Sequence, residues 1–229
     1  MPRTAAQGPA EPSALPLGGE PGRHRGTPPA PPPMSSATAP ASPSPASPAP
    51  ASPAPASPAP AATLRLALAT PAATAALGAW LAEALGAGDS VLLSGPIGAG
   101  KSHLARALIR HRLAMAACPD EDIPSPTFTL VQTYAAGPLE VWHADLYRLS
   151  APDEAEELGL AEAFATALCL VEWPDRLARL RPPGAIEIAL APAGDDDEAR
   201  LATIAAPAGL VARLAAAGLA GVRALPAAP

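Results

Sequence analysis

One glycine-rich run between an apolar strand and a helix constrains the fold of this chain more than any other feature. It reads Gly95-Pro96-Ile97-Gly98-Ala99-Gly100-Lys101-Ser102, fits G-x-x-x-x-G-K-[ST] at every fixed position, and follows the apolar stretch Val91-Leu92-Leu93. Its glycines allow successive backbone N–H groups to turn toward one centre and form a concave nest for an anion. The N-terminus of the following helix adds its positive end to the same point. The run therefore predicts a phosphate-binding loop at the end of a buried strand.

Six consecutive residues of this loop and its helix are predicted to contact a bound nucleotide: Gly98, Ala99, Gly100, Lys101, Ser102 and His103. Lys101 supplies a positive charge for the outer phosphates, and the Ser102 hydroxyl is placed to bind Mg²⁺. The alternative is an ordinary glycine-rich turn. The strand–loop–helix context of all the fixed residues favours nucleotide binding.

Composition divides the chain into one folded domain and two tails. Residues 1–60 contain 19 of the 33 prolines, and the pentapeptide A-S-P-A-P occurs three times in succession within them. Such a segment buries too little apolar surface to offset its ordering entropy, so we expect a disordered tail of polyproline character. A ligand for a proline-binding domain is the alternative. We expect the folded domain at residues 61–222 and a flexible tail at residues 223–229.

Charge and hydropathy argue against several classes of protein. The formal net charge of −6 disfavours a large basic surface for nucleic acid. The first residues lack an apolar core of signal-peptide type, and Arg213 and Arg223 interrupt the longest apolar run, so we expect neither secretion nor a membrane span. Cys118 and Cys169 show no C-x-x-C pattern, which favours a reduced cytoplasmic protein, although sequence alone leaves a disulfide between them open.

The order of predicted elements indicates an α/β fold. Expected strands are residues 63–68, 90–94, 128–134, 139–146, 168–173, 185–191 and 199–206, and expected helices are residues 71–85, the segment after the phosphate loop, residues 152–160 and a C-terminal segment. Thr70 is the predicted N-cap of the first helix, with Pro71 at its first position. Gly137-Pro138 predicts a β-hairpin. We expect a single-domain, P-loop NTPase-like three-layer sandwich around a mainly parallel sheet.

Glu172 is the candidate for a second Mg²⁺ ligand. It follows four apolar residues, Leu168 to Val171, and therefore lies at the tip of a buried strand. An anion in that place is costly unless a cation or a hydrogen-bond donor meets it, so Glu172 is expected to hold the metal directly or through a water. A surface glutamate is the alternative. Trp173, the next residue, is expected to pack in the core, with a wall of the site or a partner-facing patch as the alternatives.

Asp145 and Thr127 are candidates for the hydrolytic step. Strand alternation places His143 and Asp145 on one face, where Asp145 could orient or deprotonate a water or help to hold the metal. A structural hydrogen bond, or an ion pair with Arg148, is the alternative. Thr127, in Ser125-Pro126-Thr127, could sense the γ-phosphate through Mg²⁺ as part of a loop that orders or releases. A capped turn is the alternative there.

Five short motifs follow one another in a fixed order. They are Gly98-Ala99-Gly100-Lys101-Ser102, Ser125-Pro126-Thr127-Phe128-Thr129-Leu130-Val131, His143-Ala144-Asp145-Leu146-Tyr147-Arg148-Leu149, Glu156-Glu157-Leu158-Gly159 and Val171-Glu172-Trp173-Pro174. In order and spacing they resemble the bacterial tRNA threonylcarbamoyladenosine biosynthesis ATPase family TsaE, also called YjeE. The resemblance covers about residues 62 to 220.

The resemblance implies an ATP-binding and ATP-hydrolysing subunit that supports threonylcarbamoyl transfer to adenosine 37 of tRNAs reading ANN codons. It implies TsaD-like and TsaB-like partner subunits, weak hydrolysis without them, only indirect contact with tRNA, and no membrane. By motif match, Lys101 would hold phosphate, and Ser102 and Glu172 would hold Mg²⁺. Asp145 would serve hydrolysis, and Thr127 would belong to a switch-like loop.

Two further points come with the resemblance. Thr70 and Thr74 lie where the family contacts adenine, and the choice of ATP over GTP rests on the resemblance together with the absence of an N-K-x-D stretch. The chain departs from the family at Ser102, where threonine is more usual, and at Pro96, where an acidic residue is frequent. Pro96 also removes one backbone donor from the loop.

Two other functions remain open from sequence. A small-molecule kinase would share the loop and usually carries an arginine-rich lid over the phosphates. Arg176, Arg179 and Arg181 follow Glu172 at helix-like spacing and could form such a lid. The other reading is a nucleotide-gated binding module whose turnover is incidental.

Overall fold

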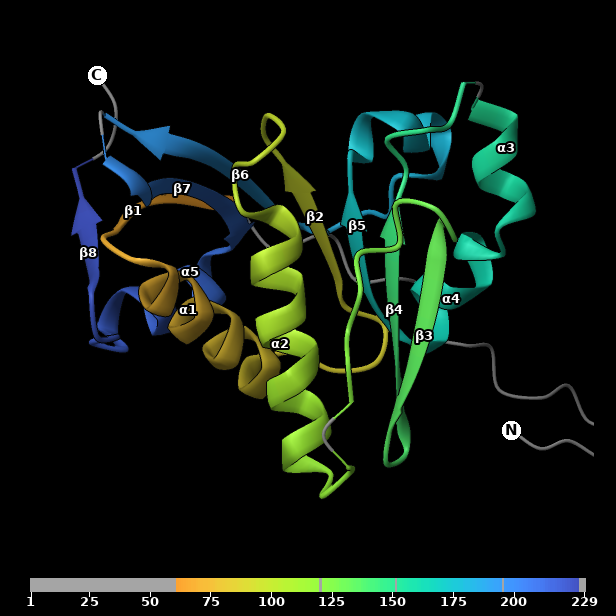
Figure 1. The fold of residues 1–229 in the computed structure, drawn as a ribbon, viewed down its shortest axis with the longest axis horizontal. Coiled ribbons are helices and arrows are strands. Elements are labelled where there is room, and N and C mark those ends of the chain that lie inside the picture. The colour runs from red at the N-terminus through yellow and green to blue at the C-terminus, as the bar shows by residue number, and fades with distance from the viewer. Residues whose placement is uncertain (1–60, 120, 151, 195, 227–229) are drawn as a thin grey trace, which may run out of the picture. The chain divides into compact units, whose positions relative to one another are not determined.

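A mixed β-sheet organises the described part of the chain (Figure 1). The structure is a computed structural model and describes residues 61–119, 121–150, 152–194 and 196–226, so the tail expected at residues 1–60 lies outside the described residues. In these residues one eight-stranded sheet runs in the order β3 (Val131–Ala136), β4 (Leu139–Asp145), β5 (Leu168–Glu172), β2 (Ser90–Ser94), β6 (Ile186–Ala193), β7 (Asp196–Pro207), β1 (Ala61–Leu68) and β8 (Val222–Leu225).

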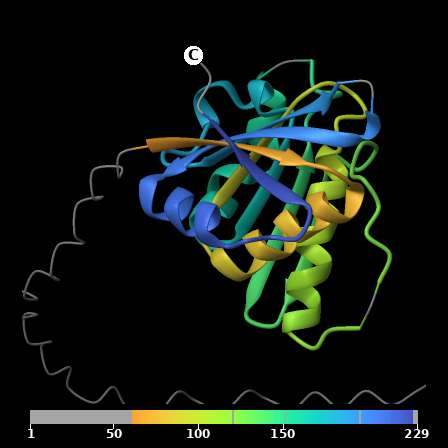
Figure 2. The same ribbon diagram turned by 90° about the vertical axis from the view of Figure 1, so that its left-hand side faces the viewer.

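Parallel pairing is confined to the centre of this sheet. The pairs β4–β5, β5–β2 and β2–β6 are parallel, whereas β3–β4, β6–β7, β7–β1 and β1–β8 pair antiparallel. The expected α/β class is confirmed, but the sheet is mixed instead of mainly parallel. Hairpins explain the difference, because connections as short as those between β3 and β4 and between β6 and β7 join only antiparallel strands. Figure 2 shows the β1–β8 edge of the sheet from the side.

Helices cover both faces of the sheet and complete the expected three layers (Figure 1). One face carries α1 (Pro71–Ala84), α2 (Lys101–Met115) and α5 (Ala208–Ala216), and the other carries α3 (Pro152–Glu157), α4 (Leu160–Thr166) and the 3₁₀ segment η1 (Pro174–Leu180). Strand β2 shows why both faces are filled. Val91 and Leu93 enter the core under α1 and α2, while Leu92 points into the second core on the opposite face. A strand buried on both sides is typical of the centre of such a sandwich.

Local signals placed several element boundaries correctly. Helix α1 begins at Pro71, and the Thr70 hydroxyl accepts the N–H of Ala73 at 3.2 Å, as an N-cap does. Strand β2 spans the predicted residues 90–94, and Gly137 lies in the predicted β3–β4 turn at φ +65°. Proline and glycine signals succeed here because they act on the local backbone.

Other boundaries differ from the expectation. The strand predicted from residue 128 begins at Val131, because Leu130 adopts a left-handed φ of +63° and a turn precedes it. The acidic helix predicted to residue 160 ends at Glu157, since Gly159 at φ +75° starts α4. The domain boundary at residue 222 is also wrong. Residues 223–225 belong to β8, which pairs with β1.

Strand register explains how the candidate site is assembled. Glu172 at the end of β5 pairs with Leu93 of β2 on one side and with Asp145 of β4 on the other. The carboxyl ends of three parallel strands therefore meet beside the phosphate loop, which follows β2. This edge is where ligands bind in open α/β sheets.

Both cysteines are free, and Cys169 is buried. Burial, assisted by Glu140, raises the pKa of the Cys169 thiol to about 12, as fits an unreactive core thiol. Among the described residues, every helix is too short or too polar to cross a bilayer.

A glycine sets the distance between α1 and α2. A Cβ on Gly78 would lie 2.9 Å from both the Ala107 Cβ and the Leu104 carbonyl oxygen of α2. We expect Gly78→Leu to lower the free energy of unfolding by about 1–3 kcal/mol, since overpacking must push the helices apart. Urea unfolding followed by circular dichroism measures this. Ala72→Leu, at an exposed position of α1, is the control and should change stability little.

Candidate active site

Backbone conformation gives the phosphate loop its shape. Gly95, Gly98 and Gly100 have φ values of +130°, +78° and +97°, a region that side chains disfavour. At Gly95 the requirement is also steric, because a Cβ would come within 2.1 Å of the Leu190 carbonyl oxygen on β6. Gly100 is the N-cap of α2, so the loop leads directly into the N-terminus of that helix. This is the geometry expected of an anion-binding loop.

The Lys101 ammonium group lies folded against its own loop. Its Nζ donates to the carbonyl oxygens of Gly95 at 2.8 Å and Pro96 at 2.9 Å, and it lies 4.1 Å from the centre of the Trp173 ring. Burial lowers the pKa of Lys101, although the nearby carboxylates of Glu172 and Asp145 act in the opposite direction. Trp173 packs against the core beneath the site, as expected, and it also lines the cavity, which is the alternative that the sequence left open.

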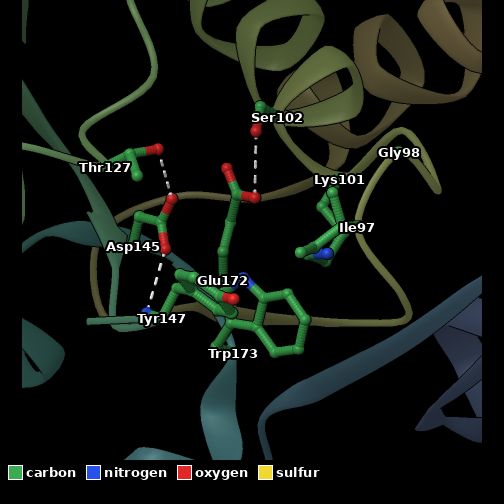
Figure 3. Close-up of a pocket in the computed structure, with 9 residues that line it drawn as sticks. All are labelled: Ile97, Gly98, Lys101, Ser102, Thr127, Asp145, Tyr147, Glu172 and Trp173. Carbon is green, nitrogen blue, oxygen red and sulfur yellow. Dashed lines mark hydrogen bonds between the residues drawn. The ribbon is translucent and has the colours of Figure 1, made fainter. Parts of the chain in front are cut away.

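Ser102 and Glu172 meet in a cavity of about 210 Å³ beside the loop (Figure 3). The Ser102 hydroxyl donates to Oε2 of Glu172 at 3.0 Å, and the other carboxylate oxygen accepts from Nε2 of His143 at 2.9 Å. Glu172 is 2 % exposed, so its charge depends on these donors and on Lys101. The oxygen pair formed by a hydroxyl and a carboxylate suits a hard cation such as Mg²⁺.

Asp145 and Thr127 lie in the same cavity (Figure 3). The Thr127 hydroxyl donates to Oδ2 of Asp145 at 2.8 Å, and Oδ1 accepts the backbone N–H of Tyr147 at 3.0 Å. The Ser125 hydroxyl lies 3.0 Å from that of Thr127 and 3.5 Å from that of Ser102. Because Thr127 has already given its one hydrogen to Asp145, Ser125 is the donor in the shorter contact. Three hydroxyl groups thus lie between the two carboxylates, but the Ser102–Ser125 contact has no hydrogen to share, because Ser102 gives its own to Glu172.

A second cavity of about 250 Å³ lies on the other side of Gly98. Its lining residues are Pro71, Thr74, Gly98, Gly100, His103, Glu198 and Arg200. His103 is tied to α1, because its Nε2 lies 2.9 Å from the Pro71 carbonyl oxygen. Thr74 and His103 therefore lie together next to the loop. Thr70 is outside this lining, and its hydroxyl is engaged in capping α1.

Arg200 is the site residue that sequence reasoning missed. From β7 it donates to the Gly98 carbonyl oxygen at 3.2 Å and to the Ala199 carbonyl oxygen at 2.9 Å. No short motif marks it, since it lies 102 residues from Gly98 along the chain. Tyr147 and Ile97 were also missed as lining residues, although both stand within motifs already recognised.

The arginines considered as a kinase lid are directed elsewhere. Arg179 forms an ion pair with Glu156 of α3, and Arg181 lies 3.5 Å from Glu187 of β6. Neither they nor Arg176 line the two cavities beside the phosphate loop. The arrangement gives no support to a lid over the phosphates.

Comparison with known proteins assigns the family. The sequence model of a family described as "Threonylcarbamoyl adenosine biosynthesis protein TsaE" matches residues 68–201. The chain belongs to the TsaE family. Relatives with the name tRNA threonylcarbamoyladenosine biosynthesis protein TsaE include those of Rickettsia felis, 42 % identical over 110 residues, and of Bacillus subtilis, 36 % identical over 111 residues.

The matched lengths and a solved structure complete the comparison. The Rickettsia felis alignment covers 48 % of this chain and 62 % of the relative, and the Bacillus subtilis alignment covers 48 % and 66 %. The crystal structure of Bacillus subtilis YdiB is similar, with a TM-score of 0.53, 27 % identity, and coverage of 67 % of this chain and 92 % of that one. Every residue lining the two cavities falls within the TsaE match at residues 68–201.

Arg200 should support nucleotide binding by holding the phosphate loop. We expect Arg200→Met to weaken ATP binding roughly 5–30-fold, because a charge-assisted hydrogen bond contributes about 1.5–3 kcal/mol at most and part of it is recovered by water. Equilibrium dialysis with labelled ATP gives the dissociation constant. Arg223→Met, at an exposed position of β8, is the matched control. Equal affinities in the two variants would contradict a role for Arg200.

Proposed function

We propose that this chain is a Mg²⁺-dependent ATP-binding and ATP-hydrolysing subunit that serves formation of threonylcarbamoyladenosine at position 37 of tRNA. The family, whose name refers to this modification, supports the pathway. The observation that carries the ATPase part is the contact of Ser102 with Glu172 at 3.0 Å, next to Lys101 and within the phosphate loop's cavity. A phosphate loop without such a carboxylate would bind phosphate but would lack a second protein ligand for the metal.

Each side chain has a defined task in this proposal. Lys101 exchanges its two carbonyl partners in the loop for phosphate oxygens, which carry full charge and bind an ammonium group more strongly. Ser102 and Glu172 would hold Mg²⁺, which when bound neutralises charge on the phosphates. The cavity that Thr74 and His103 line would receive the nucleoside, with ATP as the nucleotide.

Asp145 gives a physical reason for weak hydrolysis by the protein alone. Both of its carboxylate oxygens already accept hydrogen bonds, one from the Thr127 hydroxyl and one from the Tyr147 backbone. Each oxygen keeps a second lone pair, but the two bonds hold the carboxylate in one orientation, and a general base must point a lone pair at the attacking water. Movement of the Thr127 loop would free Oδ2, and a partner subunit that shifts this loop would raise the rate.

The surface around the cavity suits such a partner. Ile97, which lines the cavity, is 75 % exposed, and Phe128, which follows the lining residue Thr127 in the chain, is 85 % exposed. The Arg148 guanidinium lies 5.3 Å from the centre of the Phe128 ring. Exposed apolar side chains gathered at one place are typical of protein interfaces. We assign this surface around Ile97 and Phe128 to TsaD-like and TsaB-like subunits of a threonylcarbamoyl transferase complex. Contact with tRNA would then be indirect, through these subunits, and the complex would act in the cytoplasm.

The function is tested in cells by depleting the protein and measuring threonylcarbamoyladenosine in bulk tRNA. We expect the modification to fall, and to be restored by wild-type protein and by the surface control Asp153→Asn. Asp145→Asn should bind ATP normally, lose about 10²–10⁴-fold in hydrolysis rate as expected for a missing general base, and fail to restore the modification. Unchanged modification after depletion would refute the pathway. Restoration by a hydrolysis-dead Asp145→Asn would favour a nucleotide-gated binding module instead.

The partner surface has its own test. Phe128→Ser should weaken stimulation of ATP hydrolysis by the two partner subunits, raising the partner concentration for half-maximal effect about tenfold or more, as loss of a large interface aromatic does. Hydrolysis by the isolated protein should not change. Met115→Ser, which removes a 52 % exposed side chain at the far end of α2, is the control. Equal stimulation of both variants would place the interface elsewhere.

A further inference from the structure

His143 is the most deeply buried polar side chain at the site and has no role in the function proposed above. It lies on β4, two residues before Asp145, and is 0 % exposed. Strand alternation turns His143 and Asp145 to the same face, and Asp145 is paired with Glu172. The imidazole on β4 thus reaches the Glu172 carboxylate at the end of the neighbouring strand β5.

The direction of the hydrogen bond between them follows from chemistry. A carboxylate has no hydrogen to give, so Nε2 of His143 donates to Oε1 of Glu172 across 2.9 Å. The opposite ring nitrogen, Nδ1, is buried and finds no hydrogen-bond partner in the described part of the chain. A buried nitrogen without a partner costs free energy that an apolar side chain of similar size would avoid. The bond to Glu172 is therefore the one polar contact of His143 that can offset this cost.

The two oxygens of Glu172 are consequently assigned to different neighbours. Oε1 is held by His143 from within the core, and Oε2 is directed at the Ser102 hydroxyl at 3.0 Å, in the cavity beside Lys101. A carboxylate held by one oxygen can rotate less about its terminal bond. The other oxygen, Oε2, therefore stays on the side of Ser102, which would supply the other metal ligand.

We propose that His143 is a positioning residue that fixes Glu172 so that only Oε2 faces the divalent cation. This rests on the proposed function, because it takes Ser102 and Glu172 as the Mg²⁺ ligands. Partners that orient a ligating carboxylate contribute strongly to metal affinity without touching the metal. The competing reading is a histidine that only fills space in the core, and such a residue would affect folding but not the Mg²⁺ requirement.

Two substitutions separate these readings. His143→Leu fills a similar volume without a donor, whereas the side-chain amide of His143→Gln can still donate to Glu172. ATP binding is measured by equilibrium dialysis, first with EDTA and then over a Mg²⁺ titration, using purified full-length protein. We expect His143→Leu to raise the Mg²⁺ concentration for half-maximal enhancement of ATP binding about 10–100-fold, with His143→Gln close to wild type. ATP binding in EDTA should be alike in all three proteins, because Lys101 and the loop are unchanged.

The outcomes are distinguishable. A folded His143→Leu protein with the wild-type Mg²⁺ requirement would overturn the inference, as would an equal loss of ATP binding with and without Mg²⁺. Circular dichroism monitors folding, and His143→Asn, whose amide is too short to reach Glu172, replaces the leucine variant if that one does not fold. Glu172→Gln tests the underlying metal site. If wild-type and Glu172→Gln proteins share one Mg²⁺ requirement, the proposed Mg²⁺ site fails whatever His143 does.

Discussion

The buried carboxylate of Glu172 is the constraint on which the rest of the site depends. A charge at the end of a strand that is apolar on both faces is tolerated only where donors and a cation surround it. The fold provides them from two separate segments: Lys101 and Ser102 at the start of α2, and His143 on β4. All three must be in register with β5, so the parallel pairing of β2, β5 and β4 determines the chemistry as well as the core.

The two strands on the other side of β2, β6 and β7, contribute to the same end of the sheet. Strand β6 approaches Gly95 so closely that a side chain there would collide with the Leu190 carbonyl, which fixes how the loop leaves β2. Strand β7 adds Arg200, whose guanidinium holds the Gly98 carbonyl oxygen at the middle of the loop. The loop is thus supported from the sheet on one side and closed by Trp173 on the other. The backbone of Trp173 itself has a strained left-handed conformation, with φ +59°.

Sequence predicted those parts of the structure that depend on neighbouring residues. The phosphate loop, the Thr70 cap and the β3–β4 turn follow from glycine, proline and hydroxyl residues at fixed spacing, and Glu172 from an apolar run that ends in a carboxylate. It did not predict Arg200 or strand β8, because each is defined by a partner far away in the chain. It also placed Phe128 in a strand, although the bond from the Leu130 N–H to the Pro126 carbonyl closes a turn there. Alternating residues favour a strand. The backbone N–H of Asp145, however, donates to the Leu130 carbonyl oxygen, and this tertiary contact favours the turn over the strand.

Three hydroxyl groups lie between the two carboxylates of the site. Ser125 lies within reach of both Ser102, beside Glu172, and Thr127, which occupies Asp145. Ser102 gives its hydrogen to Glu172 and Ser125 gives its hydrogen to Thr127, so the 3.5 Å approach of Ser102 to Ser125 has no hydrogen left to share. The bond from Thr127 to Asp145 thus stands apart from Ser102, and Phe128, the residue after Thr127, is exposed. The orientation of the Asp145 carboxylate is therefore set by its two donors, the Thr127 hydroxyl and the Tyr147 backbone N–H, and not by Ser102.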